Sequence, residues 1–184
     1  MARNIPRRFI VATAVHHRNN PECSKLVQLE YKKRHDKVAG AVYWSLCETY
    51  HINHSEQRYQ HTAKPVIEMQ SVKILWDMNI QTDHVIEHRR PDIVVIDKDN
   101  KRALLIDIAV PADARMEEKE QEKMDRYQDL ARELKKSWKV ETKVIPIVVG
   151  ALGIVAKCLE KNMKKAGANA TIELLQKAAL LGTS

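Results

Sequence analysis

The sequence predicts a single α/β domain with a long N-terminal helix, a small mixed sheet that contains a β-hairpin, and flanking helices. Three observations support this fold class. Between residues 92 and 110, two segments rich in β-branched residues stand on either side of a polar turn. A long segment with almost no glycine or proline precedes them. A charged segment with apolar residues at helical spacing follows them, between residues 115 and 138.

The composition sets limits on the class of protein. The chain has 184 residues, 44% of them hydrophobic and 30% charged, which is typical of a folded domain with a real core. Its net charge of +7 favours an anionic partner, and nucleic acid is the first candidate. Three widely spaced cysteines form no disulfide framework, so we expect a reducing compartment, either nucleus or cytoplasm. No apolar run is long enough for a membrane span.

The N-terminal residues 1–22 predict a basic tail in front of a domain over residues 23–184. No acidic residue occurs before Glu22. An arginine-rich start without acidic residues is also a feature of transit peptides, so that alternative stays open.

Residues 24–52 favour one long helix, with an imperfect apolar stripe. Its middle is strongly basic, so Lys32, Lys33 and Arg34 are candidate contacts to DNA phosphates, as are Arg89 and Arg90. A solvated charged helix face explains the same pattern. Further along, we expect residues 51–68 to form a loop and residues 74–86 to contain a strand. The loop is rich in histidine, but the spacing of Cys47, His51, His54 and His61 matches no standard zinc site.

The hairpin between residues 92 and 110 is the most informative segment. A two-residue or a four-residue turn gives the same register, in which Asp97 faces Arg102 and Asp92 faces Asp107. Side chains alternate along a strand, so the carboxylates of Asp92 and Asp107 share a face, about 4.5–5.5 Å apart at Cβ. Facing like charges destabilise a sheet unless a cation lies between them. A hard divalent cation is the obvious candidate.

An ordinary structural role accounts for one of the two aspartates more readily than for the other. Asp92 can simply begin a strand, where acidic residues are common. Asp107 is harder to explain in this way, because it interrupts the apolar strand Leu-Leu-Ile-Asp-Ile-Ala-Val. A carboxylate buried there is costly without a partner.

The segment from Arg115 to Trp138 predicts a single helix with a buried stripe at its C-terminal half. Extended backward from Tyr127 in steps of three or four, the stripe reaches Lys123 and then Lys119 or Glu120. A lysine therefore faces the strand that bears Asp107, where it could balance charge, hold a phosphate or stabilise charge at a scissile group. Lys123 is the first candidate and Lys119 its rival. A small rotation of the helix would instead leave Lys123 in solvent.

The rest of the chain predicts one more strand and two short helices. Residues 143–149 form an apolar, β-branched segment, and Pro146 within it favours an edge strand or a distortion. Residues 155–166 and 170–181 favour helices, separated by Gly167.

Together these residues resemble the PD-(D/E)xK nuclease superfamily. Pro91-Asp92 is followed, after fourteen residues, by Asp107 in an Ile-Asp-Ile strand. More narrowly, the chain resembles the restriction-like endonuclease domain at the C-terminus of LINE-type, non-LTR retrotransposon polyproteins. Further matching motifs occur in the right order: Arg34-His35-Asp36, Trp76-Asp77, Arg90-Pro91-Asp92, residues 107–111, Glu122-Lys123 with Tyr127, and residues 145–153.

The resemblance implies a restriction-endonuclease-like fold and cleavage of one DNA strand, dependent on Mg²⁺ or Mn²⁺. In such elements the nick exposes a 3′ end that primes reverse transcription. Carried over by position, Asp92 and Asp107 would hold the metal and Lys123 would be the motif lysine, with Tyr127 beside it. The implied partners are DNA and, in a full-length protein, element RNA; no small-molecule cofactor is implied.

The chain departs from the family pattern at three points. Ala109 stands two residues after Asp107, where the superfamily usually has lysine; in the retrotransposon group the lysine is displaced to the helix, which supports Lys123. The usual zinc knuckle is reduced to Cys23 and at most His17, which cannot complete a tetrahedral site, so zinc is not expected. The upstream reverse transcriptase is absent, so we expect a fragment of an element. A catalytically inactive nucleic-acid-binding remnant and a non-nuclease interaction domain remain alternatives.

Overall fold

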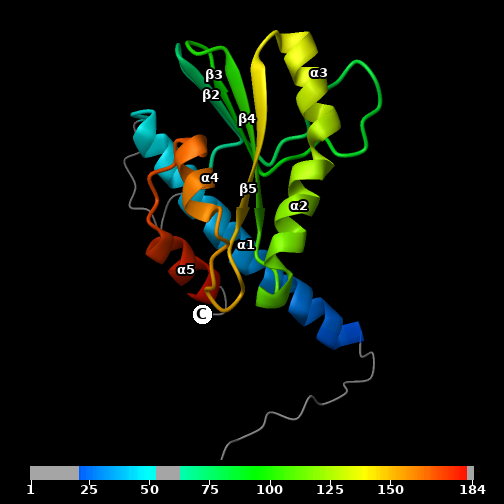
Figure 1. Ribbon diagram of the computed structural model, residues 1–184, viewed down its shortest axis with the longest axis vertical. Coiled ribbons are helices and arrows are strands. Elements are labelled where there is room, and N and C mark those ends of the chain that lie inside the picture. Colours follow the sequence, from blue (N-terminus) through cyan, green and yellow to red (C-terminus); the bar gives the residue numbers. More distant parts are fainter. Residues whose placement is uncertain (1–20, 53–62, 182–184) are drawn as a thin grey trace, which may run out of the picture.

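The computed structural model describes residues 21–52 and 63–181, and these form an α/β structure around one mixed sheet (Figure 1). The sheet has five strands in the order β1-β2-β3-β4-β5. The first four strands are antiparallel, and β5 runs parallel to β4. The predicted α/β class and mixed sheet are therefore confirmed. The strands are β1 (Val66–Glu68), β2 (Val72–Trp76), β3 (Ile93–Asp97), β4 (Arg102–Ala109) and β5 (Glu141–Val148).

Helices cover both faces of the sheet (Figure 1). One face packs against α1 (Pro21–Thr49) and α4 (Leu159–Ala166), and α5 (Ile172–Leu180) packs against α1 on the same side. The other face packs against α3 (Gln128–Trp138), which follows α2 (Met116–Arg126) and the short 3-10 helix η2 (Asp113–Arg115). The long N-terminal helix is confirmed. No helix in the described part of the chain is long and apolar enough to cross a membrane.

Strand β4 shows how the two faces are built. Leu104, Ile106 and Ile108 join the core on the α1 side, whereas Leu105 packs with α3 on the other. A strand covered on both faces is apolar almost throughout, as β4 is. Asp107 has the same parity as Leu105, so its carboxylate points to the face that carries α2 and α3.

The hairpin register agrees with the prediction. Asp97 pairs with Arg102 and Ile93 with Ile106, and continuing the ladder by one position sets Asp92 opposite Asp107. The Asp97 carboxylate stabilises the turn, because it accepts hydrogen bonds from the backbone and side chain of Asn100 and from Arg102. Pairing within one hairpin thus brings the two candidate metal ligands together.

Two differences from the expected elements lie before the hairpin. Strand β1 occupies part of the segment predicted as a loop, and with three residues it is too short to show a periodic pattern. The strand predicted within residues 74–86 ends at Trp76. Asp77 then adopts a left-handed backbone conformation, with φ of 47°, which redirects the chain into a loop that continues to Asp92.

The prediction of one continuous helix over residues 115–138 is wrong. The helix is interrupted at Tyr127, whose φ of −105° and ψ of 11° lie outside the α-helical range. The Tyr127 side chain is buried, and its hydroxyl donates a hydrogen bond to the backbone oxygen of Arg90 at 3.0 Å. The break therefore coincides with an anchor between the helix and the hairpin.

The C-terminal elements follow the expected order. Strand β5 is an edge strand, which is one of the two alternatives that Pro146 favoured, and Pro146 lies beside Asp107 in the ladder. Gly167, with φ of 73°, ends α4. Helix α4 begins at Leu159, four residues later than predicted.

Candidate active site

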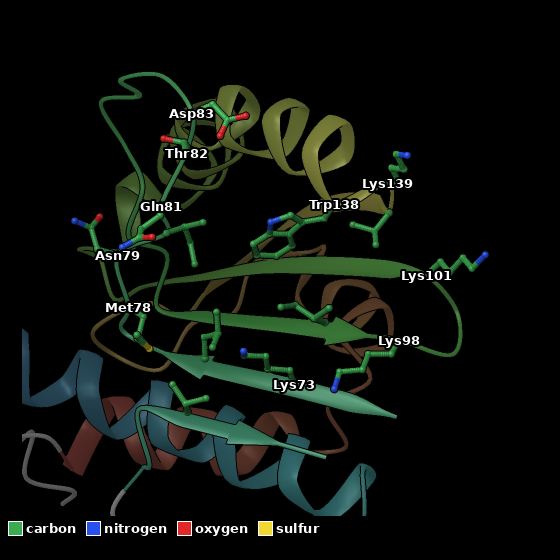
Figure 2. A pocket seen from close by; sticks show the side chains of 15 residues that line it. Lys73, Met78, Asn79, Gln81, Thr82, Asp83, Lys98, Lys101, Trp138 and Lys139 are labelled. Carbon is green, nitrogen blue, oxygen red and sulfur yellow. The ribbon is translucent and has the colours of Figure 1, made fainter. Parts of the chain in front are cut away.

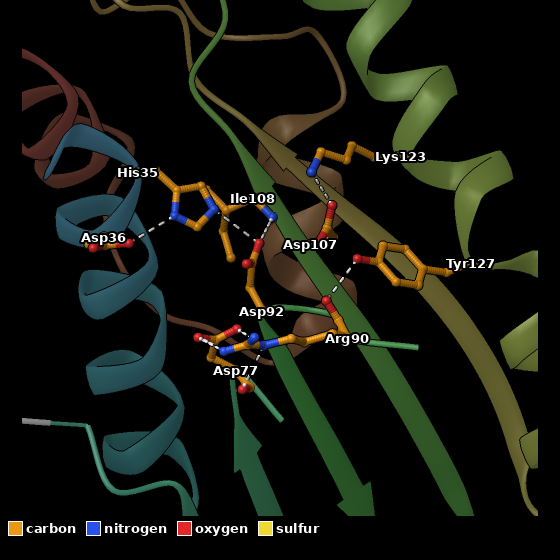
Figure 3. A network of polar contacts seen from close by, with 9 residues as sticks. All are labelled: His35, Asp36, Asp77, Arg90, Asp92, Asp107, Ile108, Lys123 and Tyr127. Carbon is orange, nitrogen blue, oxygen red and sulfur yellow. Dashed lines mark hydrogen bonds and ion pairs between the residues drawn. The ribbon is translucent and has the colours of Figure 1, made fainter. Parts of the chain in front are cut away.

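A cleft of about 760 Å³ opens at the end of the hairpin, with residues of α1 and α2 in its lining. Asp92 and Lys123 line this cleft, and the Asp107 carboxylate contacts Lys123 (Figure 3). Asp92 directly precedes β3, whereas Asp107 lies within β4. Two adjacent strands and two helices from distant parts of the chain therefore converge on one carboxylate pair.

The Asp92 carboxylate is held on two sides. Its Oδ2 accepts a hydrogen bond from the backbone N–H of Ile108 at 2.6 Å and lies 3.2 Å from Nε2 of His35. Burial tends to raise the pKa of Asp92, but His35, the Ile108 N–H and Lys123 outweigh burial and hold that pKa below its ordinary value. Asp92 is therefore an anion at neutral pH.

His35 of α1 is the most important residue to which the sequence assigned no role. Its Nε2 faces Asp92 and its Nδ1 lies 3.1 Å from Oδ1 of Asp36 (Figure 3). Burial tends to lower the pKa of His35, but the carboxylates of Asp92 and Asp36 outweigh it and raise the pKa to about 9. His35 is thus an imidazolium at neutral pH and contributes a positive charge behind Asp92.

Asp107 has a very different environment from Asp92. Its side chain is only 2% exposed. Burial, followed by the charge of Asp92, raises the pKa of Asp107 to about 6, against the opposing effect of Lys123. Two facing carboxylates with pKa values moved in opposite directions are typical of functional sites.

Lys123 of α2 reaches the carboxylate pair, and Lys119 does not. The ammonium Nζ of Lys123 lies 2.5 Å from Oδ2 of Asp107. Lys119, one turn earlier, forms its ion pair with Glu122 of the same helix. Of the two lysines that the helical stripe contained, Lys123 is the one that contacts Asp107.

Tyr127, Arg90 and Asp77 form a chain of contacts beside Asp92 (Figure 3). Burial, with the adjacent Asp107 carboxylate, raises the pKa of Tyr127, so the hydroxyl stays protonated and donates to Arg90. The Arg90 guanidinium binds both carboxylate oxygens of Asp77, at 2.7 and 2.8 Å. The backbone N–H of Asp77 in turn donates to the backbone oxygen of Asp92 at 2.7 Å. These contacts fix the chain on either side of Asp92.

The five candidate DNA contacts are distributed unevenly around this cleft. Lys32 is exposed and lines it. Lys33 pairs with Glu30, and Arg34 donates to the backbone oxygen of Ala151 at 3.2 Å, which ties α1 to the loop after β5. Arg90 is engaged with Asp77, and Arg89 is half-buried in the loop before β3. Arg126 of α2 also lines the cleft, although no sequence pattern singled it out.

The donor set suits a hard cation but is small. The two aspartates present carboxylate oxygens, which Mg²⁺ and Mn²⁺ prefer, and Mg²⁺ commonly keeps several waters beside one or two carboxylates. No group of three or more His, Cys, Asp or Glu side chains within residues 21–52 and 63–181 is arranged to hold a metal. A cation bound between Asp92 and Asp107 would therefore depend on these two carboxylates and on displacement of the flexible Lys123 side chain.

Of the zinc candidates, the structure describes Cys47 and His51, and His51 is exposed just after α1. Cys47 is buried in the core, where burial raises the pKa of its thiol to about 11, so it stays protonated. His17, His54 and His61 lie outside the described residues, as do the side chain of Cys23 and residues 1–20 of the predicted tail.

Comparison with known proteins does not identify a family. No model of a known protein family matches the chain. No curated protein sequence matches it either.

Proposed function

We propose that this chain is a metal-dependent DNA endonuclease domain that nicks one strand, and that it is related to the restriction-like endonucleases of LINE-type retrotransposons. In that setting the nick would prime reverse transcription. One observation carries the proposal. Asp92 and Asp107 face each other across the open end of a hairpin, with Lys123 against the buried carboxylate, beside a cleft.

Each residue has a physical task in this proposal. Asp92 and Asp107 would hold Mg²⁺ or Mn²⁺, and the bound cation would activate water and stabilise negative charge on the phosphate. His35 and the Ile108 N–H orient the Asp92 carboxylate. The ammonium of Lys123, which contacts Asp107, would stabilise negative charge that develops on a phosphate held beside the carboxylate pair. Tyr127 holds the Arg90 segment and so the position of Asp92.

A second candidate is a catalytically inactive nucleic-acid-binding remnant. The observation that favours it is the charge balance of the site. Lys123 and the imidazolium of His35 already offset the two carboxylates, so the pair can persist without a metal. This alternative requires DNA binding without cleavage.

Nicking of supercoiled plasmid in the presence of Mn²⁺ separates the two candidates. The nuclease proposal expects the wild-type protein to nick at least about 100-fold faster than Asp107→Ala, as is typical when a group that stabilises charge is removed. A wild-type rate no higher than that of Asp107→Ala would exclude the nuclease proposal. Binding retained by both proteins would then favour the inactive remnant.

A further inference from the structure

A second and larger cleft, of about 1040 Å³, lies beside α3 on the open part of the sheet face (Figure 2). Its floor comes from β1, β2 and β3, and its walls come from the loop after β2 and the C-terminal end of α3. It shares no lining residue with the candidate active site. Consecutive residues line the two clefts: Asp77 lines the candidate active site, and Met78 lines this second cleft.

The lining of this second cleft is basic. It contains four lysines, Lys73, Lys98, Lys101 and Lys139, and one acidic residue, Asp83. Lys73 and Lys98 pair with Glu68 nearby. Lys101 and Lys139 are exposed, and neither has an ion-pair partner among the residues that the structure describes. Two exposed ammonium groups at one end of a cleft are suited to phosphate groups.

Trp138 gives the cleft an aromatic surface. It is the last residue of α3, is 36% exposed, and lies over the strands between the lysine-rich end and the loop (Figure 2). The loop end contributes the short polar side chains of Asn79, Gln81 and Thr82, which can donate and accept hydrogen bonds. Phosphate-binding cations, an exposed indole and amide groups thus follow one another along a single groove.

We infer that this cleft binds an unpaired strand of nucleic acid, with a base stacked on Trp138 and backbone phosphates at Lys101 and Lys139. A base can stack on an exposed indole only when it is not paired within a duplex, and such stacking is tolerant of sequence. A small inorganic anion would use the lysines but not the indole. The inference concerns binding and does not depend on cleavage at Asp92 and Asp107.

Fluorescence anisotropy of a labelled oligothymidylate of about 12 nucleotides, in EDTA to prevent cleavage, measures this binding. Trp138→Ala should weaken binding by about 5- to 150-fold, the usual range for the loss of one stacking platform. Trp138→Phe keeps an aromatic face and should bind within about fivefold of the wild type. Thermal melting of both variants separates a loss of binding from a loss of folding.

The lysines are tested by the salt dependence of binding. Lys101→Ala with Lys139→Ala should make the slope of log affinity against log salt shallower by about 1.4, because two phosphate contacts are lost. Lys157→Ala with Lys161→Ala is a matched control, since it removes the same charge from a different lysine cluster. This control should leave the slope within about 0.3 of the wild type.

Three results would overturn the inference. The first is wild-type affinity in Trp138→Ala. The second is an equal change of slope in the two double-lysine variants, which would mean that net charge alone drives binding. The third is a loss of affinity for duplex DNA in Trp138→Ala that equals its loss of affinity for the single strand.

Oligouridylate should bind within about tenfold of oligothymidylate, because stacking and phosphate contacts do not depend on the 2′-hydroxyl. Because binding is measured in EDTA, without cleavage, this test is independent of the nuclease proposal.

Discussion

The ammonium of Lys123 lies 2.5 Å from Oδ2 of Asp107, although the two residues come from a helix and a strand that are separated by a turn and a short 3-10 helix. The PD-(D/E)xK pattern would place a lysine at position 109. Ala109 is instead buried and packs with Val148 and Ala156. The positive charge next to Asp107 comes from Lys123 of α2.

Replacing the lysines separates their roles. Lys123→Met removes the ammonium from the carboxylate pair and should slow Mn²⁺-dependent plasmid nicking by about 100- to 1000-fold. Lys119→Met is the matched control, because Lys119 lies on the same helix but pairs with Glu122. It should nick within about threefold of the wild type. Equal losses in the two variants would contradict the assignment of Lys123.

Asp107→Asn should stabilise the metal-free protein at neutral pH. The pKa of Asp107 is raised to about 6 in the folded state from an ordinary value of 3.8. Folded protein therefore binds more protons than unfolded protein between these values, so Asp107 reduces stability as the pH rises from about 4 to 6. Removing the charge should recover on the order of 1–3 kcal/mol above pH 6.

Thermal melting in EDTA measures this gain. The variant should melt about 2–10 °C higher at pH 7.5, and the difference should shrink toward pH 4. Asp92→Asn is the opposite case, because the pKa of Asp92 is lowered and its charge is stabilising; that variant should melt below the wild type. A lower melting temperature for Asp107→Asn at pH 7.5 would contradict the environment assigned to Asp107.

His35 should make stability depend on alkaline pH. Its pKa is raised to about 9 in the folded state from an ordinary value of 6.5, so its stabilising effect is complete below pH 6.5 and is lost as the pH rises through 9. His35→Gln should therefore be less stable than the wild type by on the order of 1–3 kcal/mol at pH 6, and by much less at pH 9.5.

An NMR titration of the imidazole provides a direct check in metal-free protein. The pKa of His35 should fall by more than about one unit in Asp92→Asn, because the main partner that raises it is lost. An unchanged pKa in that variant would show that the contact with Asp92 does not control the charge of His35.

Divalent cations should stabilise the wild-type protein through the carboxylate pair. A ligand present at 100 times its dissociation constant adds about 2.7 kcal/mol, which corresponds to a rise of about 5–11 °C in melting temperature for a chain of this size. Mn²⁺ should give such a rise in the wild type and none in Asp92→Ala with Asp107→Ala. The same rise in both proteins would place the metal elsewhere, and no rise in either would favour the inactive remnant.

The hairpin, and the presence of a lysine that faces it from the following helix, could be predicted from sequence because both depend on local geometry. Turn closure sets the register that pairs Asp92 with Asp107, and helical spacing aligns Lys123 with Tyr127. His35 could not be assigned, since its contact with Asp92 spans 57 residues and a single histidine in a basic helix has no periodic signal. The motifs that resemble the nuclease family include His35 and Asp77 but do not indicate what either residue contacts.

The misassigned elements have equally specific causes. The break at Tyr127 has no glycine or proline to mark it, and the hydrogen bond to Arg90 that accompanies it forms only in the folded chain. Strand β1 is three residues long, and its pairing with β2 rather than its own pattern defines it. The basic cleft beside Trp138 combines residues from β2, the hairpin turn and α3, so no single segment of the sequence indicates it.

The most direct test of the central claim is the rate of Mn²⁺-dependent plasmid nicking by the wild type, Asp92→Asn, Asp107→Asn and the double variant, prepared and assayed together. If the two aspartates act as one site, each single change should reduce the rate by at least about 100-fold, and the double variant should be no slower than either single variant. A wild-type rate equal to that of Asp107→Asn would contradict the claim.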